Sequence, residues 1–310
     1  MLDDLIEQFV ELNYDTEASK ENARCRLVWL KRYLKDIGKD ITEMGKKEII
    51  AFKPWIKKQK GRHGKHLKAS YIRMIISTIK CMFEFLETLD IDNPFKEIPS
   101  RVLKRLKPEA KKDRVPREFS SEEIKKIFDW LQDRADEDAY LACLISFATG
   151  TRLAETLKIK AKNIRNREGH VVIFIRHAKG FRERACILGV PVKKPNGVVS
   201  SKVIKRLNEE VKRKVLEKKK AVEGYLFGDE MERRRLRYRI QKDLQRLSNE
   251  EDIDIHFHSF RANYGAKALR ARIPLEYVSK QLGHKTTKTT ETYYARVKDE
   301  FTLSFMKDRI

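Results

Sequence analysis

The sequence has no apolar run long enough to span a membrane and no cysteine pattern typical of a metal centre or a disulfide framework. Its 310 residues include four cysteines, which are scattered and form no Cys-x-x-Cys pair. This excludes the common zinc motifs and a small disulfide-bonded secreted fold, and it favours a reduced compartment. The N-terminus is acidic and amphipathic, unlike a secretory signal. We therefore expect a cytoplasmic protein with no membrane contact.

The chain also lacks internal repeats, low-complexity tracts and any evident cluster of acidic residues of the kind that a two-metal nuclease needs. Positive charge is abundant: 69 Lys and Arg stand against 46 Asp and Glu, a formal net charge of +23. Such an excess of one sign predicts a polyanionic partner, and its spread along the whole chain favours nucleic acid. A thermophilic or otherwise highly charged protein without an anionic ligand would explain the 37% charged residues, but not the excess of one sign.

Residues 1–107 are predicted to form a helical domain, because apolar residues recur there at helical spacing. Thr42 is placed to cap one of these helices, Ser70 opens a long helix, and Asn93-Pro94 ends the helical block. The apolar stripes are Leu2, Leu5, Ile6, Phe9 and Val10, then Leu27, Leu30, Tyr33, Leu34 and Ile37, and finally Ile72, Ile75, Ile76, Ile79, Phe83, Phe85 and Leu86.

Residues 108–117 continue a mostly basic stretch that contains Pro108 and Pro116, which predicts an interdomain linker that lies on DNA. A solvated loop is the other interpretation of this charge run. Ser120 and Glu123 then form a capping-box signature, so a second domain, residues 118–310, begins there. It is predicted to be helical except for one β-hairpin, made of residues 171–175 and 184–188.

Five short segments of the second domain carry candidate chemistry. In the first, Gly150 ends a helix and is followed by Arg152 and Glu155, three residues apart and on one helical face. The carboxylate can steer the guanidinium while the guanidinium points at a phosphate. In the second, Lys179 lies at the tip of the hairpin, where it could reach into a groove. Taken alone, Arg152 and Glu155 are more simply a surface ion pair, and Lys179 is more simply a turn lysine.

The other three segments carry histidines and tyrosines. His258 and Arg261 are again three residues apart on one helical face, and a histidine can exchange protons near neutrality. His256 lies close to them but on a different face. His284 follows a helix stop at Leu282-Gly283, and Tyr293 lies nine positions later, beside Tyr294. A helix-surface pair and a buried aromatic pair are the simpler alternatives for these residues.

Taken in order, these segments resemble the tyrosine recombinases, the phage-integrase family, of the Xer and integrase type. Arg152 resembles the first catalytic arginine, Lys179 the β-hairpin lysine, and His258 with Arg261 the His-x-x-Arg box. His284 resembles the histidine of Leu-Gly-His, and Tyr293 the nucleophile. The likeness spans about residues 118 to 295 by motif. It extends loosely over the N-terminal helices, which resemble the family's core-binding domain.

Two departures from the family pattern are visible. Ala262-Asn263 follows Arg261, where many relatives carry His-Thr, and Ala178 replaces a common glycine before Lys179. Neither position is catalytic in the family, so the departures bear on the subfamily rather than on the chemistry.

The resemblance implies a mainly α (α+β) fold: an N-terminal helical, SAM-like core-binding domain and a C-terminal catalytic domain, helical with a small antiparallel β-sheet. It implies a site-specific recombinase or integrase that cleaves and rejoins DNA through a 3′-phosphotyrosine. Arg152, Arg261 and His284 would stabilise the phosphate, and His258 would assist deprotonation of Tyr293. Lys179 would protonate the leaving 5′ oxygen, and Glu155 would support the site.

No metal, ATP or other cofactor is expected from this resemblance. The expected partners are double-stranded DNA with a specific site, copies of the same chain in a tetramer on two paired sites, and accessory directionality proteins. The protein would be nucleoid-associated when bound to DNA, and it would belong to a mobile element or an archaeal or thermophilic host. The expected DNA-binding residues are Lys65, Arg73, Arg101, Lys104 and Arg114.

Two alternatives stay open at this point. A type IB topoisomerase shares phosphotyrosine chemistry but relaxes supercoils without exchanging partners. A DNA-binding protein that has lost catalysis would keep the fold, although all six expected catalytic positions are filled here.

Overall fold

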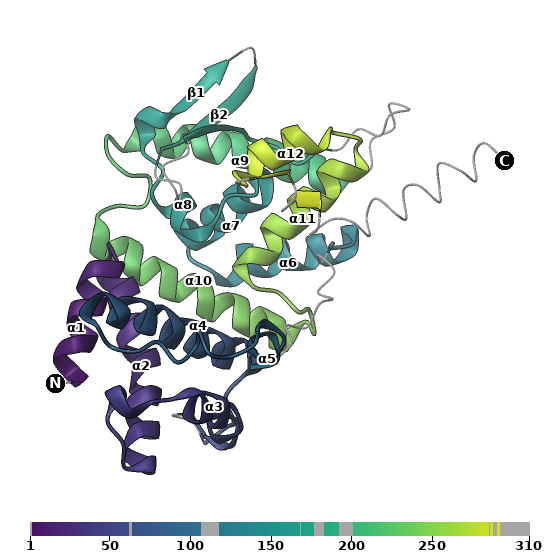
Figure 1. The fold of residues 1–310 in the computed structure, drawn as a ribbon. Helices are drawn as coiled ribbons and strands as arrows, with labels where there is room; N and C mark the ends of the chain where they lie inside the picture. Colours follow the sequence, from purple (N-terminus) through teal and green to yellow (C-terminus); the bar gives the residue numbers. More distant parts are fainter. Residues whose placement is uncertain are drawn as a thin grey trace. The chain divides into compact units, whose positions relative to one another are not determined.

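The computed structural model describes residues 2–61, 64–106, 118–167, 169–176, 183–191, 201–284, 286–287 and 290–291. The chain forms two compact units, Met1–Arg114 and Val115–Ile310, and each is described by itself (Figure 1).

The first unit is a bundle of helices around one apolar core. Its helices are α1 (Leu2–Asn13), α2 (Glu17–Ile37), α3 (Lys46–Lys58), α4 (Ala69–Leu86) and α5 (Ser100–Leu106). Helices α1, α2 and α4 pack on one another, and α3 packs on α2. Phe9, Leu27, Leu30, Ile75 and Phe83 are fully buried in this core, as their helical spacing predicts.

The helix ends in this unit follow the local sequence. Thr16 caps α2 by accepting a hydrogen bond from the Ser19 amide, and Gly38 ends the helix in the left-handed region. The prediction that Thr42 caps α3 is wrong. Asp40 caps a separate 3₁₀ turn, Ile41–Glu43, in which the Thr42 amide donates to Asp40, so α3 starts only after Gly45.

The second unit surrounds one buried helix, α7 (Glu137–Thr149). Every residue of α7 from Ala139 onward is buried, which explains why its sequence is apolar on all sides. The surrounding helices, all of which contact α7, are α6 (Ser121–Arg134), α8 (Leu153–Leu157), α9 (Lys202–Ala221), α10 (Glu230–Glu250) and α11 (Phe257–Arg270). The predicted capping box is confirmed: Ser120 and Glu123 exchange side-chain-to-backbone hydrogen bonds at the start of α6.

A three-stranded antiparallel sheet completes this unit together with α12 (Leu275–Leu282). Its strands are β1 (Ile164–Arg167), β2 (His170–Ile175) and β3 (Arg184–Ile187), in the order β1-β2-β3. The predicted hairpin is present, with Ile173 opposite Cys186. The sequence did not predict β1, because Ile164 is its one buried residue and the rest of the strand is polar.

Among the residues described, every helix is too short or too polar to cross a membrane.

Candidate active site

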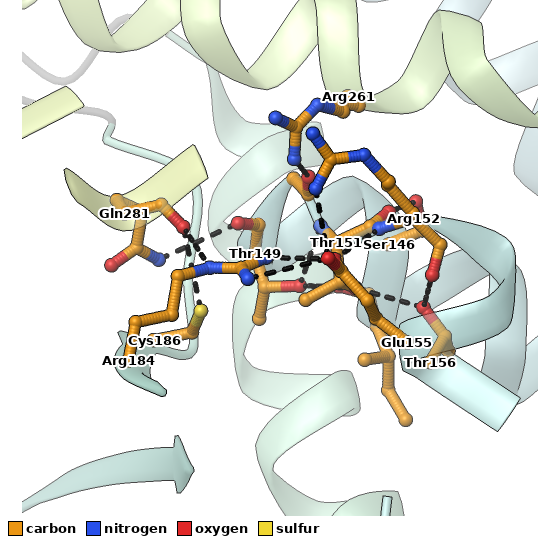
Figure 2. Close-up of polar contacts among 12 residues, drawn as sticks. Ser146, Thr149, Thr151, Arg152, Glu155, Thr156, Arg184, Cys186, Arg261 and Gln281 are labelled. Carbon is orange, nitrogen blue, oxygen red and sulfur yellow. Dashed lines mark hydrogen bonds and ion pairs between the residues drawn. The ribbon is translucent and has the colours of Figure 1, made fainter. Parts of the chain in front are cut away.

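The site is built around the turn that joins α7 to α8. Gly150 ends α7 with a φ of +69°, and Arg152 then caps α8. The buried hydroxyl groups of Thr149, Thr151 and Thr156 form a hydrogen-bonded chain across the turn, with O–O distances of 2.9 and 2.8 Å (Figure 2). These bonds hold the backbone that carries Arg152 in one conformation.

Position 150 requires glycine both because of its backbone conformation and because of the side chains around it. A Cβ atom at this position would lie 2.5 Å from Leu282 Cδ2 and 3.1 Å from Tyr264 Cδ1, and both of these side chains are buried. The carbonyl of Gly150 also accepts a 2.8 Å hydrogen bond from Arg261 Nη1.

We expect the substitution Gly150→Ala to lower the free energy of unfolding by about 2–4 kcal/mol, because it adds left-handed strain to overpacking. Urea unfolding of the full chain measures this loss. Gly169→Ala is the matched control: Gly169 has a φ of +77°, but a Cβ atom there would meet nothing within 4 Å. If the two variants lost the same free energy of unfolding, the contacts of a Cβ atom at position 150 would contribute nothing to that loss.

Glu155 is the carboxylate at the centre of the turn. Its side chain is 3% exposed, whereas that of Arg152 is 36% exposed. Glu155 accepts from the Arg152 amide at 2.9 Å and from Arg152 Nη1 at 2.8 Å. Burial by itself would raise the pKa of Glu155, but hydrogen bonds and charge from Arg184 and Arg152 outweigh it and hold the pKa below its ordinary value. The ionised carboxylate therefore orients Arg152.

Arg184 belongs to the site, although its sequence motif did not predict this. This residue begins β3, and its buried guanidinium binds Glu155 through Nη2 at 2.7 Å and Nη1 at 3.3 Å. Its Nε donates to the Gln281 carbonyl at 2.9 Å. A charged residue at a strand end ordinarily faces solvent. The sequence carried no direct signal for it, because only the folded structure shows that Glu155 is buried and so needs cationic partners.

Gln281 joins α12 to the outer strand of the sheet. Its side-chain oxygen accepts from the Ile187 amide at 3.2 Å, and its side-chain nitrogen donates to the Ile187 carbonyl at 3.0 Å. The end of α12 is thus fixed to β3, directly before the turn that carries His284.

Helix α11 supplies a guanidinium and an imidazole to the same region. Arg261 is buried, with 3% of its surface exposed, and it binds the Gly150 carbonyl. Figure 2 shows the guanidinium groups of Arg152 and Arg261 extending toward the same region. His258 lies on the same helix and keeps an exposed surface. His256 is the N-cap of α11: its Nδ1 accepts from the Ser259 amide at 3.1 Å, which is a structural role.

His284 follows the left-handed Gly283 that ends α12. Its Nδ1 lies 2.6 Å from the hydroxyl of the buried Thr290. Although part of the His258 surface stays exposed, the neighbouring elements cover enough of the ring to lower its pKa to about 4, and the charges of Arg261, His256 and Arg152 add to this shift. The pKa of His284 is also lowered to about 4, by burial, Arg261, Arg152 and Arg184. Both imidazoles are therefore neutral at pH 7.

Four of the six predicted catalytic residues are thus brought within electrostatic reach of one another: Arg152, His258, Arg261 and His284. Lys179 and Tyr293 lie outside the described residues, as do Ala178 and Tyr294. No group of His, Cys, Asp and Glu in the described part of the chain could hold a metal ion.

The predicted DNA-binding residues belong to the first unit. Four of them are exposed there, and Arg114 lies outside the described residues. The exposed four are Lys65, Arg73, Arg101 and Lys104.

The model of the phage integrase family matches residues 117–300. The chain belongs to the phage integrase family. Among curated phage integrase relatives, the tyrosine recombinase XerC of Staphylococcus epidermidis is 28% identical over 237 residues, which cover 74% of this chain and 72% of that protein. A probable integrase/recombinase of Aquifex aeolicus is 21% identical over 302 residues, 91% of this chain and 92% of the relative.

Solved structures show that the fold is also that of phage integrases. The XerH site-specific recombinase, in a post-cleavage complex with its difH substrate, aligns with a TM-score of 0.65 at 16% identity. The alignment covers 93% of this chain and 79% of XerH. A lambda integrase dimer bound to a COC′ core site aligns with a TM-score of 0.62 at 15% identity, over 93% of this chain and 96% of the integrase. As a member of this family, the chain is a tyrosine recombinase, an enzyme of site-specific DNA recombination.

Proposed function

We propose that this recombinase cuts and rejoins double-stranded DNA at a specific site through a covalent 3′-phosphotyrosine on Tyr293. The Tyr293 oxygen attacks the scissile phosphorus, and the bond from phosphorus to the 5′ oxygen breaks. The phenolic proton passes toward His258, and Lys179 gives a proton to the leaving 5′ oxygen. Rejoining is the reverse reaction with another 5′ hydroxyl, so the step consumes no ATP and requires no metal.

The main support for this proposal is that the fold brings together two arginines and two neutral histidines from distant parts of the second unit. A phosphodiester resists attack because its negative charge repels nucleophiles, and more charge develops as the fifth bond forms. Arg152 and Arg261 supply fixed positive charge for the non-bridging oxygens. Without DNA, His258 is neutral but only a weak base, because burial and positive charge lower its pKa; a negative phosphate bound beside it would raise this pKa again and let the ring take the phenolic proton.

His284 fits the role of a hydrogen-bond donor to the same phosphate. When the Thr290 hydroxyl donates to Nδ1, the neutral ring carries its proton on Nε2, which can then donate to an oxygen. Glu155 supports the site by holding Arg152 and does not touch the phosphate.

Exposed cations supply the surface for binding DNA. Besides the four exposed residues of the first unit, helix α10 presents Arg235, Arg237 and Arg246 to solvent, together with Tyr238, whose surface is 67% exposed. Contacts of this kind bind the phosphate backbone and weaken as salt rises. A lambda integrase tetramer bound to a Holliday junction is among the solved structures that this chain resembles. We propose the same arrangement here, a tetramer on two paired sites, with accessory proteins setting the direction.

Capture of the covalent adduct tests the proposal and finds the site in one experiment. The protein is incubated with sheared genomic DNA, the mixture is denatured, and the DNA that stays attached to protein is sequenced. We expect discrete sites, with protein attached to the 3′ end of the cut strand at each break and the attached nucleotide on the peptide that contains Tyr293. The absence of any adduct would contradict the proposal and favour a DNA-binding protein without catalysis.

A plasmid with two of the captured sites separates recombination from topoisomerase activity. A recombinase exchanges the segments between the sites. Relaxation of supercoils without a recombinant product would identify a type IB topoisomerase instead.

A further inference from the structure

The buried guanidinium of Arg184 connects three segments of the active site. It binds both oxygens of Glu155 in α8, at 2.7 and 3.3 Å, and the Gln281 carbonyl at the end of α12, at 2.9 Å (Figure 2). Its side chain is 3% exposed, so it does not itself form part of the surface that meets DNA.

Stability alone does not account for such a pair. Taking two charges out of water costs several kcal/mol per ion, and apolar side chains of similar volume often replace a buried ion pair without loss. The burial of the pair between Arg184 and Glu155 is therefore weak evidence for a role in stability, whereas its position beside Arg152 indicates a role in the site.

The first connection runs through Glu155 to Arg152. Each carboxylate oxygen of Glu155 is shared: Oε1 accepts from Arg152 Nη1 and Arg184 Nη1, and Oε2 accepts from the Arg152 amide and Arg184 Nη2. A bidentate arginine fixes the plane of a carboxylate. Because Arg184 fixes this plane from the buried side, the outer face of the carboxylate holds the Arg152 guanidinium in one direction.

The second connection runs through the end of α12 to His284. Besides binding the Gln281 carbonyl, the guanidinium of Arg184 lies against Gly283, where a Cβ atom would be 2.7 Å from Nη1. The turn that carries His284 is therefore built directly on the Arg184 side chain.

We propose that Arg184 is a positioning residue for strand cleavage, which sets the place of Arg152 through Glu155 and that of His284 through the turn at Gly283. This inference rests on the proposed function. A displacement of about 1 Å in either group is sufficient to cost on the order of 100-fold in rate. Arg184 thus acts on the rate of cleavage rather than on the affinity for DNA.

The test uses the full chain and a duplex that contains a captured site. Arg184→Met keeps much of the side-chain volume and removes the fork. We expect the single-turnover rate of adduct formation to fall on the order of 100-fold, with the Kd for the duplex changed by no more than about twofold. We expect Arg184→Lys to lie between wild type and Arg184→Met, because one donor to Glu155 can remain.

A matched control separates positioning from general destabilisation. Ile127→Ala creates a cavity in the same unit, under α6, where Ile127 is fully buried. Both variants are compared at a temperature well below their unfolding transitions. Ile127→Ala is expected to keep the wild-type rate of adduct formation. If Arg184→Met forms the adduct as fast as Ile127→Ala, or loses affinity as much as rate, the inference is overturned.

The substitution Glu155→Gln tests the connection to Arg152. If Arg184 acts through the carboxylate, the two substitutions are not additive. The fold-loss in the rate of adduct formation that Arg184→Met causes should then be smaller, by a factor of about five or more, in the Glu155→Gln background than in the wild type. Purely additive losses would show that Arg184 does not act through Glu155. Failure of the wild-type protein to form any adduct would instead refute the proposed function, so the two failures are distinguishable.

Discussion

Replacement of Tyr293 by phenylalanine is expected to abolish the covalent adduct while leaving DNA binding intact. The substitution removes one oxygen atom, the proposed nucleophile, and no charge at neutral pH. The cationic groups around the phosphate remain, so the Kd for a captured site should change by less than about threefold, while adduct formation falls to background. Denaturing gels of labelled duplex measure the adduct, and fluorescence anisotropy measures the Kd.

The neighbouring residue supplies the matched control. Tyr294→Phe removes the same atom one position away, and it is expected to leave adduct formation close to that of the wild type. An adduct that persists in Tyr293→Phe and disappears in Tyr294→Phe would show that the nucleophile is Tyr294. If both single variants form the adduct, the double variant decides: loss of the adduct there would show that either tyrosine can attack, and its persistence would place the nucleophile elsewhere in the chain.

Replacement of Arg261 by lysine is expected to slow cleavage by on the order of 10²–10³-fold. Lysine keeps the positive charge, but it lacks the planar fork that can bind the Gly150 carbonyl and a phosphate oxygen at the same time. The loss should therefore appear in the single-turnover rate of adduct formation. DNA affinity should change little, because many other cations contact the backbone.

Arg270→Lys is the control on the same helix. Arg270 is exposed at the end of α11 and pairs with Glu118. It does not belong to the group formed by Arg152, His258, Arg261 and His284. The same chemical change there should leave the rate within about twofold of the wild type. Equal losses in the two variants would indicate that α11 tolerates no arginine-to-lysine change and would remove the special role of Arg261.

The helices could be predicted from the sequence because each buries a stripe of apolar residues, and a stripe such as Phe9 with Val10 is visible without knowing its partner. The fold class and the hairpin are confirmed on this basis. Strand β1 was missed because a polar edge strand is defined by its neighbour: Arg165 and Asn166 pair with β2, and nothing in their own side chains requires a strand.

The catalytic candidates could be named from the order of short motifs, but the contacts that hold them could not. The pair between Arg152 and Glu155 lies within one turn, so its spacing predicted it, and the structure shows the bond. Arg184 is 29 residues away from Glu155 along the chain, and only folding brings the two together. The roles of Lys179 and Tyr293 stay predictions, since both lie outside the described residues.

The position of Gln281 has a consequence for how copies of this protein meet. The outer edge of a β-sheet exposes amide and carbonyl groups that can recruit a strand from another molecule. At Ile187 a single side-chain amide satisfies both of these groups, as a neighbouring strand would. Because recombination would gather identical chains on paired DNA sites at high local concentration, we expect the closed position at Ile187 to hinder strand pairing between copies at this edge.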